Sequence, residues 1–180
     1  MLLPAFTAEF RRYRSLTERA AAQLPWPLLR TLLDPHTNSI AIIMKHVAGN
    51  LRSRWTDPFT TDGEKPWRNR DSEFIDDYAN DDSGRAALDA HWLAGWTTLE
   101  QTLAPLTDAD MTGGRTLTIR GEPHTLALAL TRSLSHTAYH TGQVTLLART
   151  LAAKHNLPWT TLTVPKGGSV QHNTGMGFTP

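Results

Sequence analysis

The chain has 180 residues, of which 39% are hydrophobic and 19% charged, which suits one domain over residues 1–180 with a single buried core. It has no cysteine, which excludes disulfides, thiolate metal sites and cysteine nucleophiles and leaves His, Asp and Glu for metal or acid–base chemistry. A formal net charge of +1 argues against a dedicated nucleic-acid binder.

The first predicted helix covers residues 5–23. Apolar side chains follow three-to-four spacing from Phe6 onward, and Pro25 and Pro27 end the pattern. Charged residues begin at Glu9, so the stretch has neither the apolar core of a signal peptide nor the length of a membrane span. We therefore expect a soluble, cytoplasmic protein that does not contact a membrane.

A second helix is predicted over residues 39–55, where an apolar stripe follows a choice of capping residues, Thr37, Asn38 or Ser39. Residues 56–82 then hold nine acidic and three basic side chains and lack a sustained helical stripe. This acidic connection is expected to be a solvated loop with one helical turn near SEFIDDYA; an electrostatic site over a pocket is the alternative.

Two further helices are predicted over residues 83–104 and 123–154, the second with Pro123 as its first residue. The segment GGRTLTIRGEP between them should be briefly extended. The tail after residue 155 lacks a helical period, and we expect it to pack back through Trp159, Leu162 and Val164 and then become polar and loose. The sequence therefore predicts an all-α protein with four long helices and an irregular C-terminal tail.

Two histidines in the last long helix form an HxxxH pattern. His136 and His140 lie one turn apart, so both imidazoles can reach one metal ion. Taken alone, the pattern more often reflects two solvent-exposed or half-buried histidines that bind no metal. His46 lies inside the second helix, where a solvated loop does not explain it, and it could supply a third ligand. Three protein ligands would leave coordination positions open, as in catalytic sites.

Polar residues near these histidines are candidates for supporting roles. Gln143 continues the helix face of His136 and His140, and Asn50 follows His46 by one helical turn. Either could orient a ligand or a bound water, or could simply form a polar rim. Asp71 and Glu73 in the acidic connection are weak candidates for a general base. The other histidines are explained by helix ends, isolation or the tail, and are left out of the site: His36, His91, His124, His155 and His172.

Three segments together resemble the DinB/YfiT-like superfamily. They are IMKHVAGNL in the second helix, HTAYHTGQ in the last one, and PWTTLTVPKGGS near the C-terminus. The longer stretch NSIAIIMKHVAGNLRSRWTDPFTTDGEKPWRNRDSEF is similar to an uncharacterised bacterial DinB-like subgroup.

The resemblance implies a four-helix bundle of up-down-down-up order and a divalent ion, zinc or nickel, held by three histidines. By motif these are His46, His136 and His140. It also implies a homodimer and an enzyme that uses a low-molecular-weight thiol, with a metal-activated thiolate attacking a small electrophilic substrate.

The residues leave other functions open. Water in place of the thiol would make a metal-dependent hydrolase, and histidines kept only for structure would make a non-catalytic, dimeric metal-binding or stress protein. Three imidazoles suit zinc, nickel and copper alike, so the sequence does not select the metal.

Overall fold

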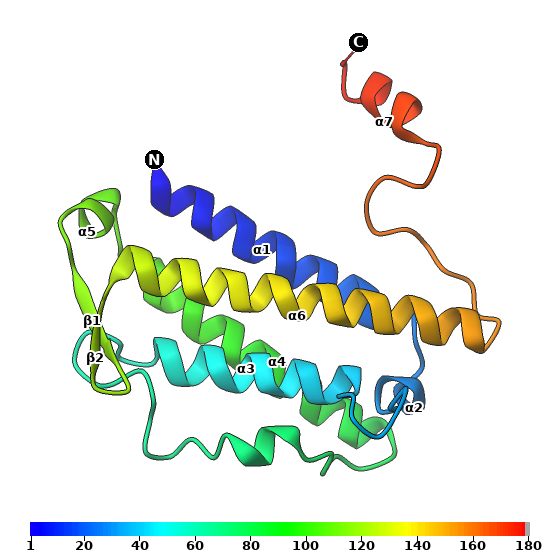
Figure 1. The fold of residues 1–180 in the computed structure, drawn as a ribbon, viewed down its shortest axis with the longest axis horizontal. Coiled ribbons are helices and arrows are strands. Elements are labelled where there is room, and N and C mark those ends of the chain that lie inside the picture. Colours follow the sequence, from blue (N-terminus) through cyan, green and yellow to red (C-terminus); the bar gives the residue numbers. More distant parts are fainter. Residues whose placement is uncertain (179–180) are drawn as a thin grey trace.

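Four long helices dominate the computed structural model, which describes residues 1–178. They are α1 (Leu2–Ala21), α3 (Ile40–Trp55), α4 (Asp82–Leu103) and α6 (Leu126–Lys154). Each end lies within three residues of its predicted position, so the predominantly helical fold is confirmed. Figure 1 shows α1 and α6 running in one direction and α3 and α4 in the other. Helix α3 contacts both α4 and α6, and α1 contacts α6.

The central helix α3 begins at a side-chain cap and is buried along most of its length. The hydroxyl of Ser39 accepts a hydrogen bond from the Ile42 amide, which selects Ser39 among the three predicted caps. Helix α4 approaches α3 closely at Gly95, where a Cβ would lie 2.6 Å from the carbonyl oxygen of Ala48. Burial of α3 places the polar side chains of Lys45 and His46 inside the protein.

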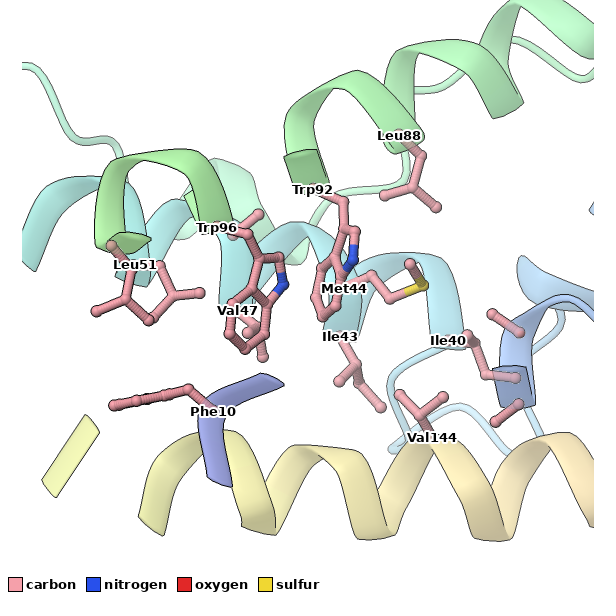
Figure 2. Packing of buried hydrophobic residues seen from close by; sticks show 14 of the residues in the cluster. Phe10, Ile40, Ile43, Met44, Val47, Leu51, Leu88, Trp92, Trp96 and Val144 are labelled. Carbon is pink, nitrogen blue, oxygen red and sulfur yellow. The ribbon is translucent and has the colours of Figure 1, made fainter. Parts of the chain in front are cut away.

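The core lies between the four long helices α1, α3, α4 and α6. Figure 2 shows Trp92 and Trp96 of α4 among apolar side chains of α3, with Phe10 of α1 and Val144 of α6 facing them. The two indole rings meet edge to face with centroids 5.4 Å apart. Both indoles are buried and belong to the hydrophobic core. None of the described helices combines the length and apolar character needed to cross a bilayer.

The start of α6 differs from the prediction. Pro123 lies in strand β2 (Glu122–Thr125), which pairs antiparallel with β1 (Thr116–Ile119), so it is not the first residue of the helix. The helix begins at Leu126, where the hydroxyl of Thr125 accepts a hydrogen bond from the Leu128 amide. Proline is tolerated in β2 because each strand of a two-stranded sheet is an edge strand.

Short elements complete the chain. They are α2 (Trp26–Leu29), the 3-10 helix η1 (Asp71–Phe74), α5 (Asp108–Thr112) and α7 (Ser169–Gly175). Helix η1 is the turn predicted near SEFIDDYA. Trp159 and Leu162 pack against the core as expected. The last part of the tail is less irregular than predicted, because α7 follows the KGGS segment and stands apart from the long helices (Figure 1).

Candidate metal centre

The three predicted metal-binding histidines converge in the structure. His136 and His140 lie on one face of α6, and α3 brings His46 against them. The Nε2 atom of His136 lies 3.1 Å from that of His46 and 3.2 Å from that of His140. At the roughly 2.1 Å of an imidazole–metal bond, two ligand nitrogens stand about 3.0 to 3.4 Å apart in octahedral or tetrahedral geometry. These two spacings fit a single divalent ion, and the ligand atoms of all three histidines lie within 4.8 Å of one another.

The outward-facing nitrogens of two of these histidines are held by hydrogen-bond acceptors. The Nδ1 of His46 lies 2.8 Å from Glu73 Oε2, and the Nδ1 of His140 lies 2.7 Å from Gln143 Oε1. Because carboxylate and amide oxygens only accept, both Nδ1 atoms carry hydrogen and both Nε2 atoms present a lone pair inward. The donor set therefore suits a cation. Gln143 thus holds the His140 imidazole in place by a hydrogen bond.

Burial keeps His136 and His140 in the neutral form that binds metal. It lowers the pKa of His136 to about 3, with further lowering by positive charge at His140, His46, Arg54 and Arg68. Burial also lowers the pKa of His140, more than its hydrogen bond to Gln143 raises it. Both imidazoles are therefore neutral at physiological pH, as metal binding requires.

Glu73 is fixed between the triad and an arginine. Its two oxygens lie 2.8 and 2.9 Å from Nε and Nη2 of Arg68 while Oε2 also accepts from His46. Burial raises the pKa of Glu73, but the hydrogen bonds from His46 and Arg68 outweigh this and lower it overall. Glycine at position 49 makes room, since a Cβ there would lie 2.8 Å from the Glu73 carboxyl carbon. Glu73 is thus a positioning residue for His46.

A cleft of about 370 Å³ opens beside the triad, and both His46 and His136 line it. Asn50, predicted as a second polar neighbour, also lines this cleft. The Nδ1 atom of His46 is hydrogen-bonded by Glu73 and not by Asn50. Asp71 shares η1 with Glu73, but its side chain is exposed. The structure therefore unites the predicted ligands with Glu73, Gln143 and Asn50, and leaves Asp71 at the surface.

The connection from α3 to α4 is not a plain solvated loop. Most of its acidic side chains bind the rest of the protein, including Asp76 to Arg30 and Asp77 to Lys45. Asp62 clamps the turn between β1 and β2: Oδ1 accepts from the Arg120 amide at 2.8 Å and Oδ2 from the Gly121 amide at 2.8 Å. The acidic side chains hold the connection in place, and two of its bases, Arg68 and Arg70, line the cleft.

Sequence reasoning missed the arginines of the cleft, because they come from segments far apart in the chain and form no local motif. His124 was also misjudged. It was assigned to a helix end, but it is buried in β2, where its Nε2 lies 2.7 Å from Nη1 of Arg132. Its exclusion from the metal-binding group stands, since that group contains only His46, His136 and His140 among the described residues.

Comparison with known proteins gives a family but no function. No curated protein and no solved structure matched the chain significantly. A family described as "Protein of unknown function (DUF1572)", which is a DinB-like family, matches residues 2–168. That match includes all four long helices, the hairpin and the three histidines. The chain therefore belongs to the DUF1572 family.

Proposed function

We propose that this protein is a divalent-metal-dependent enzyme that uses a low-molecular-weight thiol to attack a small electrophile. The observation that carries the proposal is the convergence of three imidazole Nε2 atoms, two with their outer nitrogens already hydrogen-bonded, at the wall of an open cleft. The up-down-down-up bundle implied by the DinB-like resemblance is part of the proposal, and the helix directions in Figure 1 support it.

Three protein ligands leave room for a further ligand. His46, His136 and His140 would hold the ion. Among the described residues, no fourth His, Asp or Glu belongs to this group of possible metal ligands. A metal bound there would lower the pKa of a coordinated thiol and so supply a thiolate at neutral pH. Glu73 and Gln143 would keep the imidazoles aligned, and the cleft would hold the electrophile next to the centre.

The environment of Glu73 favours thiol chemistry over the hydrolase alternative. A hydrolase would benefit from a free general base near the metal, poised to take a proton from water. Glu73 already accepts from Arg68 and His46, and its pKa is lowered, so it is a weak proton acceptor. We therefore assign Glu73 to positioning and expect the attacking group to come from the thiol.

Two measurements test the proposal. Protein purified without a metal-chelating tag should contain about one equivalent of zinc, nickel or copper, and His46→Ala should lose it. The metal-loaded protein should accelerate reactions of added thiols with a panel of electrophiles, and the metal-free protein should not. Retention of metal by His46→Ala, or equal rates with and without metal across the panel, would reject the proposed function.

A further inference from the structure

The cleft beside the triad is strongly basic. It is lined by parts of α3, the connection after α3, the β1–β2 hairpin and α6. Five arginines contribute to its walls: Arg54, Arg68, Arg70, Arg120 and Arg132. Glu122 is the single acidic residue among the described residues that line it. Such an excess of positive charge in one concave site attracts anions.

Ion pairs account for only two of these arginines. Arg68 pairs with Glu73 and Glu64, and Arg120 pairs with Glu64. Within residues 1–178, Arg54, Arg70 and Arg132 have no carboxylate at salt-bridge distance. Three guanidinium groups in the cleft are therefore free of acidic partners.

Arg54 is the least satisfied of the three. Its Nε atom is buried and has no hydrogen-bond partner within the described chain, and its stem packs against Gly63. Burial lowers the pKa of Arg54, and the neighbouring charges of Arg68, Arg132 and Arg120 lower it further against the opposing effect of Glu64. Arg54 as a whole is half-buried, and a partly desolvated cation among other cations is costly unless an anion joins it.

Arg132 lines the same cleft and is held by a hydrogen bond. Its Nη1 donates to Nε2 of His124 at 2.7 Å, which fixes the guanidinium on the hairpin side of the cleft. Arginine guanidinium groups bind carboxylates and phosphates through paired hydrogen bonds. Arg54 of α3 and Arg132 of α6 line the same cleft, so both are available to an oxyanion bound there.

We propose that this cleft binds the carboxylate or phosphate group of a small anionic substrate, with Arg54 and Arg132 as its principal ligands and Arg70 at the rim. The proposal rests on the proposed function, because His46 and His136 line the same cleft and a molecule held there lies against the metal centre. The proposal narrows the substrate class to molecules that carry an oxyanion. Either the thiol or the electrophile has a carboxylate or phosphate group close to its reacting atom.

The test uses inorganic phosphate and succinate as probes, titrated calorimetrically into metal-loaded and metal-free protein at low ionic strength. The parent should bind at least one of them saturably in both forms, and the stronger probe reports whether the site prefers phosphate or carboxylate. Arg54→Gln and Arg132→Gln should each weaken binding at least about tenfold, the usual loss for one charge-assisted hydrogen bond. Arg70→Gln, at an exposed position, should weaken it without risk to the fold.

A matched control lies on the same helix as Arg132. Arg149 is exposed on α6 and does not line the cleft, so Arg149→Gln should bind both probes as the parent does. Unchanged binding in Arg54→Gln, Arg132→Gln and Arg70→Gln, or no saturable binding by the parent, would overturn the inference.

The same variants separate this inference from the proposed function. If the probes bind only when metal is present and the arginine variants are unaffected, the anion binds the metal and the arginine site is rejected, while the metal-dependent enzyme stands. If His46→Ala retains metal but Arg54→Gln loses anion binding, the proposed function fails and the anion site stands. Metal content and circular dichroism of each variant are measured in parallel.

Discussion

Replacing Gly49 by alanine would drive a methyl group into the carboxylate that holds His46. The new Cβ would overlap Glu73 Oε1 and lie 2.8 Å from its carboxyl carbon, closer than real Cβ atoms come to other atoms. Glu73 cannot retreat without loss, because Arg68 binds both of its oxygens and His46 binds one. Gly49→Ala therefore tests whether glycine is needed at this position so that the Glu73 carboxylate can lie against His46.

Two opposing effects set the size of the change. Alanine is better than glycine inside a helix by about 1 kcal/mol. Breaking a buried ion pair while leaving its charged partners in place costs about 3–5 kcal/mol. The net loss in the free energy of unfolding is then about 2–4 kcal/mol. In a chain of this size, that lowers the melting temperature by at least about 4 °C.

Metal affinity should fall as well. Loss of the acceptor that fixes a ligating imidazole lowers metal affinity by about 10- to 100-fold. Both effects can be measured on one sample, by denaturant unfolding of the metal-free protein and by competition with a coloured chelator for the metal.

Gly142→Ala is the matched control. Gly142 is an exposed residue of α6, and a Cβ there would meet no atom within 4 Å. It should therefore stabilise the protein by about 0.5–1 kcal/mol and leave metal affinity unchanged. Adding Glu73→Ala to Gly49→Ala removes the overlap, so the alanine at position 49 should then be neutral or stabilising. A Gly49→Ala protein as stable as the parent, with parental metal affinity, would refute the reasoning.

Three further predictions concern the triad and the assembly. His46→Ala, or the double replacement of His136 and His140, should abolish stoichiometric metal binding, whereas His91→Ala should retain it in the same metal analysis. In the metal-free protein, burial lowers the pKa of His136 to about 3 and also lowers that of His140, whereas the unfolded chain titrates near its usual value of about 6.5. Unfolding below that value takes up protons, so the free energy of unfolding should decrease as the pH falls from about 7 to about 5, and a urea series showing no decrease would contradict this. Light scattering at tens of micromolar should show the homodimer implied by the DinB-like resemblance, and a monomer there would count against it.

The long helices could be predicted because their periodicity and caps are local. Each apolar stripe indicates which face of the helix is buried, and capping residues such as Ser39 indicate where the helix begins. The error at Pro123 shows the limit of such signals. Proline suits both the first turn of a helix and an edge strand, and only the pairing of Pro123 with Thr118 across the hairpin decides between them.

The residues of the site likewise differ in whether a local sequence pattern reveals them. His136 and His140 are one turn apart, so a local pattern reveals them, and the resemblance to DinB-like sequences supplied His46. The role of Glu73 depends on where a long connection folds back, which no periodicity encodes. A glycine one turn along from His46 is the one signal the sequence offers for that close approach, and it indicates only that something lies near. The arginines of the cleft meet only in the folded chain.

The clamp at Asp62 ties the connection after α3 to the β1–β2 hairpin. Beyond its hydrogen bonds to the Arg120 and Gly121 amides, the amide of Gly63 donates to the Thr118 carbonyl at 2.7 Å. These bonds cross between two segments that are both outside the long helices, so neither segment can open without releasing the other. In native-state hydrogen exchange, the amides of Gly63, Arg120 and Gly121 should therefore share one opening free energy, below that of the core amides of α3. Asp62→Ala should speed exchange at all three positions together.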